Sequence, residues 1–195
     1  GLAVLRHTAS HVLAQAVQNL YPEAKVAIGP SIDTGFYYDF AHEPFSREDL
    51  DEIEKEMKKI IKKGAKIERF TKSREDAIAY FKEKNEPYKV ELIEDLPEDA
   101  EISFYSQGDW TDLCAGPHLM SVKPVKAFKL LSSSSAYWRG SEKNAMLTRI
   151  YGTAYATKDE LKEHLEQMEE AKRRDHNKLG REMKIFTTVD VIGQG

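Results

Sequence analysis

Two histidines near the start of the chain are the first residues whose type and spacing could do chemistry. His7 and His11 lie in a run with helical spacing of apolar residues. Side chains four positions apart on a helix share a face, with Cβ atoms roughly 5–6 Å apart, so both imidazoles are predicted to point the same way. Alone the pair is a weak signal, because two histidines can simply line a partly hydrated groove. The metalloprotease motif HExxH needs a glutamate after the first histidine, and that position is Thr8.

A second stretch with chemical potential lies far along the chain, around the only cysteine. Cys114 is followed four residues later by His118 and preceded by Asp112. With His7 and His11, this stretch supplies three imidazoles and a thiolate, an acceptable tetrahedral zinc set. The competing interpretation is a metal-free pocket of neutral imidazoles that move protons near pH 7. Asp112 would orient an imidazole, bind an amine or cap a turn, and the residues alone leave these alternatives open.

The elements that must position these residues form a mixed pattern. Helices are predicted over 3–20, from the N-cap Ser46 to Gly64, and after the N-cap Ser73. Strands are predicted over 25–28, 35–40, 65–70, 102–106, 110–113, 125–131 and 146–156. Residues 88–93 fit a short helix or a strand, and the serine run 132–135 is predicted to be a loop.

The absence of a regular βαβ rhythm predicts an α+β fold, with a mostly antiparallel sheet and helices packed on one face. A long charged helix is expected to follow. Thr157 and Glu160 form a capping-box signal for its start, and the helix should continue to about Lys178 and end at Gly180. Residues 184–189 are predicted to begin a new structural element, and we therefore expect the chain to be a piece of a longer protein.

Composition narrows the classes of protein to which the chain can belong. It has 195 residues, of which 41% are hydrophobic, which suits one large domain or one domain with an extension. No segment approaches the roughly 20 apolar residues of a membrane span, and no signal-peptide pattern opens the chain. A single cysteine excludes an internal disulfide and favours the cytoplasm. The net charge of -4 argues against bulk electrostatic binding of nucleic acid, and the phosphate-loop spacings GxGxxG and GxxxxGK are absent.

Seven short motifs, in one order along nearly the whole chain, resemble the editing region of bacterial threonyl-tRNA synthetases. They are Arg6-His7-x3-His11, Ala27-Ile28-Gly29-Pro30, Gly35-Phe36-Tyr37-Tyr38-Asp39, Tyr88-Lys89-Val90, Asp112-Leu113-Cys114-x-Gly116-Pro117-His118, Ala136-Tyr137-Trp138-Arg139-Gly140 and Arg149-Ile150-Tyr151-Gly152-Thr153-Ala154. Single motifs are moderately specific, but seven in this order are highly specific. One departure is Ala115, where many members carry arginine; its absence would weaken a phosphate or ribose contact without touching the chemistry.

The resemblance implies that the chain hydrolyses mischarged Ser-tRNA(Thr) by water attack on the aminoacyl ester. By analogy with the family, His7 and Lys89 are expected to be catalytic, with Lys89 acting as a base or as a stabiliser of the oxyanion. The same analogy implies that further side chains line the pocket for the seryl group and the terminal adenosine. These are His11, Tyr38, Asp112, Cys114 and His118, with Asp112 favoured for the substrate ammonium.

The resemblance also implies the cofactors, partners and domains. No catalytic metal is expected; the alternative is a zinc-dependent hydrolase of the alanyl-tRNA editing type, with zinc on His7, His11, Cys114 and His118. A third interpretation is a non-catalytic module that docks on tRNA. Residues 1–156 would be the editing domain, and residues 157–195 the linker helix and the beginning of the absent class II aminoacylation domain. Without that domain we expect no ATP binding or aminoacylation, and the full-length enzyme would form a homodimer through it.

Overall fold

The computed structural model describes residues 1–193, with side chains described for residues 1–175. The chain divides into two compact units, Gly1–Thr157 and Lys158–Gly195. Every strand of the described residues belongs to the first unit, and the second contains helix α5 (Lys158–Gly193). Among the described residues no helix is long and apolar enough to cross a membrane.

The strands form two antiparallel sheets. The larger has the order β1 (Lys25–Val26), β3 (Gly35–Ala41), β8 (Met146–Tyr155) and β7 (Ala127–Tyr137), and β2 (Ser31–Ile32) also pairs with β3. The smaller has the order β4 (Ile67–Thr71), β5 (Ser103–Gln107) and β6 (Trp110–Leu113). All the pairings are antiparallel. The predicted α+β class is therefore confirmed, with the strands divided between two sheets.

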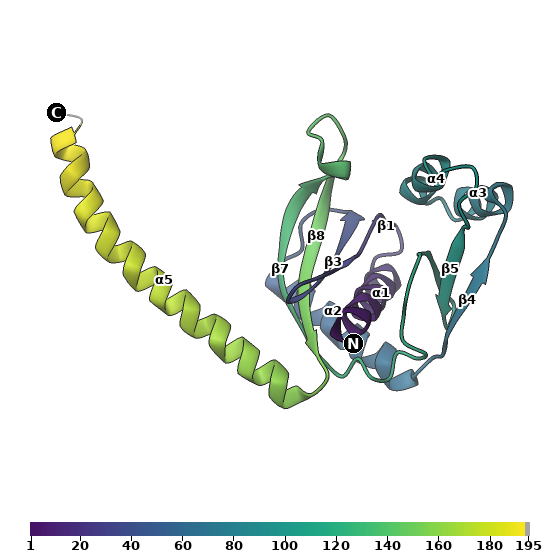
Figure 1. Ribbon diagram of the computed structural model, residues 1–195, viewed down its shortest axis with the longest axis horizontal. Helices are drawn as coiled ribbons and strands as arrows, with labels where there is room; N and C mark the ends of the chain where they lie inside the picture. Colours follow the sequence, from purple (N-terminus) through teal and green to yellow (C-terminus); the bar gives the residue numbers. More distant parts are fainter. Residues whose placement is uncertain (194–195) are drawn as a thin grey trace. The chain divides into compact units, whose positions relative to one another are not determined.

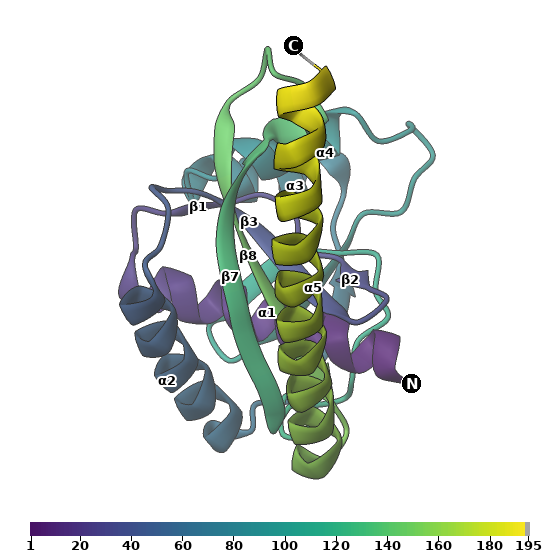
Figure 2. The ribbon, with the colours of Figure 1, turned by 90° about the vertical axis from the view of Figure 1, so that its left-hand side faces the viewer.

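Helix α1 (Leu2–Leu20) lies between the two sheets (Figure 1). This position explains why it is buried on almost every side through residues 5–17. The alanines at positions 9, 14 and 16 are completely buried and let neighbouring elements approach closely. Figure 2 shows the large sheet from the face that lies away from α1, and in this view α1 crosses behind β7 and β8. The helix that carries His7 and His11 is thus held rigidly by packing.

Helix α2 (Arg47–Lys63) packs beside α1 and against β7. The Ser46 hydroxyl accepts a hydrogen bond from the Asp49 amide, and the Asp49 carboxylate accepts one from the Ser46 amide. Gly64 ends the helix in the left-handed region at φ 65°, where a Cβ is disfavoured. Both ends therefore lie where the sequence predicts them.

Helices α3 (Arg74–Glu83) and α4 (Pro87–Glu94) pack on each other and on a small second core with Phe104 of β5. The ambiguous segment 88–93 is helical. Proline at the first helical position favours this outcome, since its fixed φ suits a helix start and its missing N–H would have no partner there. Residue Lys89 is therefore presented from a short helix.

Two expectations about the elements are wrong. The serine run 132–135 is not a loop: it continues β7, pairing with residues 148–151 of β8 after a bulge between Leu130 and Ser132. Pairing in a sheet overrides the low strand propensity of serine. Helix α5 continues past Gly180 to Gly193, whereas an end at Gly180 and a new element over residues 184–189 were expected. A single interior glycine costs about 1 kcal/mol relative to alanine and does not by itself end a helix.

Candidate functional site

The first helix and the loop after β6 converge on one group of side chains. The Cys114 Sγ lies 3.3 Å from His7 Nε2 and 3.2 Å from His118 Nε2. The His11 ring centroid is 5.3 Å from that of His7 and 4.1 Å from that of His118. His7 and Cys114, which are 107 positions apart in the sequence, are therefore in direct contact. We call His7, Cys114 and His118, which are all half-buried, the outer layer.

Contacts with the backbone fix the orientation of the His7 and Cys114 side chains. The Nδ1 of His7 lies 3.2 Å from the Pro117 carbonyl oxygen, so the Nδ1–H donates there and leaves the Nε2 lone pair towards the thiol. The amide of Gly116 lies 3.3 Å from Cys114 Sγ. Gly116 has φ 79°, and a Cβ on it would lie 2.1 Å from the Tyr105 hydroxyl oxygen, so only glycine fits this turn.

Thr8 joins the helix to the loop, although sequence analysis gave it no role. Its hydroxyl oxygen accepts a hydrogen bond of 3.1 Å from the Leu119 amide. The hydroxyl hydrogen is then available to His118 Nδ1, which lies 3.1 Å away. The side chain of Arg6 fixes the same helix against the large sheet, donating to the carbonyl oxygens of Ala154 and Asp33 at 3.0 Å and 2.7 Å.

Behind the outer layer lies a group of fully buried side chains, which we call the inner layer: His11, Tyr38, Lys89 and Asp112. The Lys89 ammonium is 2.7 Å from Asp112 Oδ1 and 3.0 Å from the Tyr38 hydroxyl oxygen. Tyr38 donates to Asp112 Oδ2 at 2.6 Å, and His11 Nε2 lies 3.5 Å from the same oxygen. The Oδ1 contact is an ion pair without the angles of an ordinary hydrogen bond. Two charges are thus held within the protein interior.

Burial lowers the pKa of the three imidazoles. For His118, burial and the neighbouring His11 and His7 lower the pKa to about 2. For His11, burial and then the charges of His7 and Lys89 lower the pKa well below 6.5. For His7, burial lowers the pKa against the opposing hydrogen bond to Pro117. All three rings are therefore neutral at physiological pH.

The thiol and the phenol are held in their neutral forms as well. Burial raises the pKa of Cys114 to about 11, with Asp112 contributing and the Gly116 amide opposing the change. Burial, with the adjacent Asp112 carboxylate, raises the pKa of Tyr38 well above 10.0. Since a thiol rather than a thiolate is present, Cys114 is a poor nucleophile at neutral pH. The arrangement favours attack by water over attack by the thiol.

The donor atoms also form a group that could hold a metal ion. One ligand atom each from His7, His11, Cys114 and His118 lie within 4.8 Å of one another. Three imidazoles and one sulfur are a donor set suited to a tetrahedral borderline-soft cation. The residues are therefore chemically compatible with a metal ion as well as with metal-free proton transfer.

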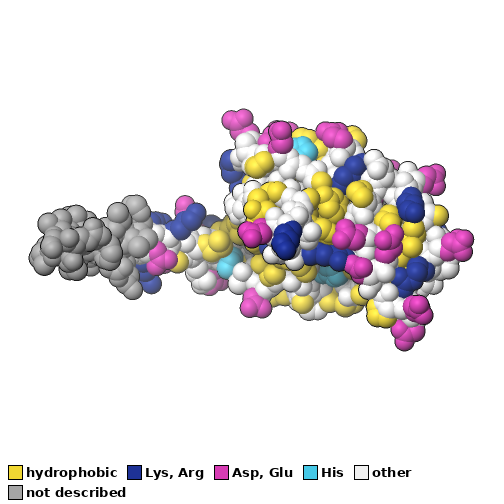
Figure 3. Space-filling view, turned by 90° about the horizontal axis from the view of Figure 1, so that it is seen from above, with side chains coloured by type: hydrophobic (Ala, Val, Ile, Leu, Met, Phe, Trp, Pro, Cys, Tyr) yellow, Lys and Arg dark blue, Asp and Glu magenta, His cyan; other side chains and the backbone are white. Residues whose placement is uncertain are grey.

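A groove of about 460 Å³ lies away from this group, where α1 and α2 end beside the β5–β6 turn. Its lining mixes the basic side chains Lys59, Lys62 and Lys63 with the acidic Glu56 and Asp109. Charges of both signs are likewise interspersed over the face seen in Figure 3. The groove contains none of the clustered histidines, so we place the candidate chemistry at the histidine–cysteine group.

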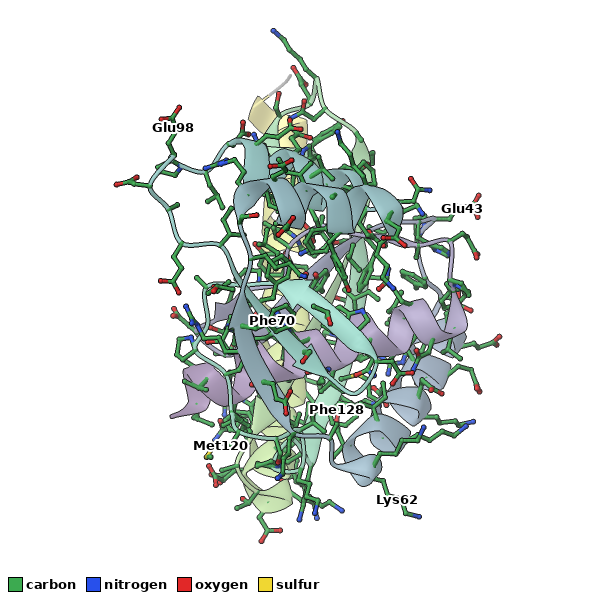
Figure 4. The ribbon with its side chains drawn as sticks, turned by 90° about the vertical axis from the view of Figure 1, so that its right-hand side faces the viewer. Glu43, Lys62, Phe70, Glu98, Met120 and Phe128 are labelled. Carbon is green, nitrogen blue, oxygen red and sulfur yellow. The ribbon has the colours of Figure 1, made fainter. Side chains whose placement is uncertain are left out.

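All seven residues that the sequence analysis selected lie in these two layers: His7, His11, Tyr38, Lys89, Asp112, Cys114 and His118. Ala115 is exposed on the same loop. Beyond it, Met120 projects into solvent with 89% of its surface exposed (Figure 4). The contributions of Thr8 and of the Pro117 carbonyl were missed, because a backbone carbonyl has no sequence signal and a helical threonine has only a weak one.

Comparison with known proteins places the chain in a family. Residues 102–151, from the start of β5 into β8, match the family model described as "Threonyl and Alanyl tRNA synthetase second additional domain". The chain is 65% identical over 187 residues, 95% of its length, to the threonine–tRNA ligase of Clostridium novyi, of which the match covers 29%. It is 63% identical over its whole length to the threonine–tRNA ligase of Acetivibrio thermocellus, of which the match covers 30%. The chain belongs to the threonine–tRNA ligase family.

Within the threonine–tRNA ligase family, the chain corresponds to an editing-domain segment of the bacterial enzymes, as the resemblance implied. It spans about 30% of the length of the curated relatives it matches. The matched domain contains Asp112, Cys114 and His118, whereas His7 and Lys89 lie before it and are covered by the whole-chain matches. Both halves of the site thus come from segments shared with threonine–tRNA ligases.

Proposed function

We propose that the chain is the editing hydrolase of a threonyl-tRNA synthetase and deacylates Ser-tRNA(Thr). The observation that carries this proposal is the contact between His7 and Cys114, which brings a neutral, half-buried imidazole next to the loop of the tRNA-synthetase domain. A neutral imidazole within reach of solvent is the group that general-base hydrolysis requires near pH 7.

In the proposed reaction His7 is the general base. Its Nε2 takes a proton from a water molecule as the water oxygen bonds to the ester carbonyl carbon. The carbonyl electrons move to oxygen and then return as the bond to the ribose oxygen breaks. The proton passes to that ribose oxygen, so the products are serine and tRNA with a free terminal hydroxyl. The hydrogen bond from Nδ1 to Pro117 stabilises the ring as its charge develops.

Lys89 has an electrostatic role in this proposal. Its ammonium is buried beside the reacting imidazoles and is fixed by Asp112 and Tyr38. A preorganised positive charge in a water-poor site stabilises a developing oxyanion without reorganisation during the reaction. Asp112 forms an ion pair with Lys89 and accepts a hydrogen bond from Tyr38. We therefore propose that Asp112 binds the substrate ammonium while it stays paired with Lys89, and not as a free carboxylate.

Selectivity for serine follows from the limit on a single binding pocket. A missing methyl group can be rejected by only about 1–3 kcal/mol, so a synthetic site for threonine also accepts serine. A second site that has no room for the methyl group removes the error. We propose that His11, Tyr38, Asp112, Cys114 and His118 line this second pocket around the seryl group and the terminal adenosine.

The direct test is deacylation of Ser-tRNA(Thr) and Thr-tRNA(Thr) by the chain, with enzyme in excess. We expect release of serine with little release of threonine, and loss of release in His7→Ala. The matched control is His42→Ala, since His42 is also a partly exposed histidine that stacks on another ring, Phe45, but lies outside both layers. Equal hydrolysis by wild type and His7→Ala would remove His7 from its role, and binding of tRNA without deacylation would favour a docking module.

A zinc-dependent hydrolase is the second candidate, favoured by the compact donor set His7, His11, Cys114 and His118. Zinc there would lower the pKa of a bound water and polarise the ester carbonyl. The chain's own residues would then act as ligands, with Thr8 holding His118 from behind. Loss of deacylation in chelator with recovery on adding zinc would favour this candidate; a rate within about twofold in chelator is expected for proton transfer by His7.

The remaining proposals rest on the family. The partner is the acceptor end of tRNA(Thr) carrying serine, and the location is the cytoplasm. In the full-length enzyme we expect a homodimer formed through the aminoacylation domain. Residues 157–195 are proposed to be the linker helix and the beginning of that domain.

A further inference from the structure

A buried carboxylate at the start of α4 has no part in the chemistry proposed above. Glu86 is only 8% exposed, yet each of its oxygens accepts a hydrogen bond. Its Oε2 accepts from the Val26 amide of β1 at 2.9 Å, and its Oε1 accepts from the Gln18 amide nitrogen of α1 at 2.8 Å. Burial raises the pKa of Glu86, and these two hydrogen bonds oppose the change.

The hydrogen bonds continue from Gln18 to the strand that carries Asp112. Gln18 Oε1 accepts from the indole nitrogen of Trp110 at 2.7 Å, and its nitrogen also donates to the Ala24 carbonyl at 3.1 Å. This pattern fixes the orientation of the Gln18 amide. Trp110 and Asp112 both belong to β6 and, two residues apart, lie on one face of it. The Trp110 ring packs edge-on against His11, with centroids 5.4 Å apart.

The chain of hydrogen bonds therefore joins the elements that carry the inner layer. Glu86 precedes the first residue of α4 and its carbonyl accepts the first helical bond, from Val90. Lys89 follows on the first turn of the same short helix, which contacts β1 (Figure 1). Gln18 belongs to the helix of His11, and Trp110 to the strand of Asp112.

We propose that Glu86, acting through Gln18 and Trp110, is a positioning residue that sets Lys89 against Asp112 and His11 for the deacylation reaction. This inference rests on the proposed function. Glu86 does not touch the outer layer, and its effect is exerted both through Gln18 and Trp110 and through the start of α4. A helix of this length has little intrinsic stability, so its placement depends on such anchors.

The substitution that tests this is Glu86→Gln, which keeps the shape of the side chain. A glutamine amide can accept at its oxygen but not at its nitrogen, so either the Val26 amide or the Gln18 nitrogen loses its acceptor. A displacement of about 1 Å far from the reacting atoms can cost up to about 100-fold in rate. We expect the single-turnover rate constant at saturating Ser-tRNA(Thr) to fall about tenfold, with the half-saturating concentration within twofold of wild type.

The matched control is Glu54→Gln. Glu54 is also 8% exposed and also accepts a backbone hydrogen bond, 2.9 Å from the Leu130 amide, but it joins α2 to β7. We expect this variant to lose comparable stability in urea and to keep the deacylation rate within twofold. Gln18→Met breaks the hydrogen-bond chain at its centre while Glu86 keeps its bond to Val26, and we expect the same tenfold loss.

A spectroscopic measurement reads the positioning without any catalysis. The chain has two tryptophans, and the Trp138 indole donates to Glu91 on α4 at 3.0 Å. In Glu86→Gln we expect the indole N–H resonances of both tryptophans to shift, because Trp110 is bonded to Gln18 and Trp138 to α4. In Glu54→Gln we expect both resonances to stay in place. An unshifted Trp110 resonance, or a deacylation rate equal to that of Glu54→Gln, would overturn the inference. If wild type does not deacylate at all, the proposed function fails, whereas the resonances still test the hydrogen-bond chain.

Discussion

The outer and inner layers of the site differ in burial and in charge. His7, Cys114 and His118 are half-buried, and burial favours the neutral form of each. Behind them, Lys89 and Asp112 form an ion pair at 1–2% exposure. A neutral thiol or imidazole costs little to desolvate, so the outer layer needs few compensating partners. The charges of the inner layer are compensated by each other and by the Tyr38 hydroxyl.

This difference predicts different consequences of substitution. Taking one member from a buried ion pair leaves the other charge without compensation, which costs more than the pair contributes. Removing a half-buried neutral ring from the outer layer leaves a space that water can enter. Inner-layer changes should therefore reduce stability first, and outer-layer changes should reduce activity with little effect on stability.

The largest effect is expected from His7→Ala. Loss of a general base lowers rates by about 10²–10⁴-fold, and we expect this drop in the single-turnover deacylation of Ser-tRNA(Thr). The free energy of unfolding in urea should change by no more than about 1 kcal/mol, because the ring is half-buried. If His7→Ala lost several kcal/mol of stability together with its activity, the outer layer would have a structural role, and the two layers would not differ as proposed.

Lys89→Met should give the largest change in stability. It leaves the Asp112 carboxylate buried with no cation, and the cost of breaking such a pair is about 3–5 kcal/mol. Adding Asp112→Asn removes the orphaned charge, so the double variant should recover part of the loss. Urea unfolding measures both.

The control for that prediction is Lys129→Met. The Lys129 ammonium lies 3.3 Å from Glu54, but the lysine side chain is 40% exposed. Removal of such an exposed pair costs about 0–1 kcal/mol. If Lys89→Met and Lys129→Met were equally mild, the inner layer would not have the energetic role assigned to it.

The sequence was sufficient to select the residues of both layers, because the seven motifs shared with the threonyl-tRNA synthetase editing region contain all of them. It also located α2, where Ser46, Asp49 and Gly64 signal the two ends through local contacts. Local signals failed where distant pairing decides: the serines of β7 form a strand only because β8 lies beside them. Segment 88–93 was ambiguous for the same reason, since α4 is fixed by contacts with α3 and β1 and by the ion pair between Lys89 and Asp112 of β6.

The division of the site into two layers could not be predicted from the sequence. Lysine is ordinarily a surface residue, and only the structure places Asp112 and Tyr38 around the Lys89 ammonium. The burial of Glu86 and Gln18 could not be predicted either, because a glutamate and a glutamine in a chain rich in polar residues are expected to be exposed. Their partners come from segments far apart along the chain.

A smaller effect is expected from Thr8→Val, at the contact between helix and outer-layer loop. Valine keeps the shape but leaves the Leu119 amide and His118 Nδ1 without their partner, and an unsatisfied buried group costs about 1–3 kcal/mol. Thr153→Val is the control, since Thr153 is also completely buried and its hydroxyl donates to the Thr34 carbonyl. Both variants should lose stability in urea, but only Thr8→Val should slow deacylation.

The smallest effect concerns the pH dependence of stability and isolates one imidazole of the outer layer. Burial lowers the pKa of His118 to about 2, whereas an unfolded chain binds a proton near pH 6.5. Below pH 6.5 the unfolded state therefore binds more protons than the folded state, and stability falls as the pH falls. Between pH 7.5 and 5.5 this single group should account for about 1.4 kcal/mol of lost stability.

His118→Gln removes this contribution while keeping a polar side chain in the loop. The free energy of unfolding is measured in urea at both pH values for each protein. Its decrease from pH 7.5 to pH 5.5 should be about 1.4 kcal/mol smaller in the variant than in wild type, even if the two proteins differ in stability at pH 7.5. The pH-dependent loss that remains comes from the other neutral imidazoles, with His11 the most deeply buried. An identical pH dependence in both proteins would mean that His118 binds a proton as readily in the folded state as in the unfolded chain, and so is largely protonated at pH 5.5. The outer layer would then carry charge like the inner one.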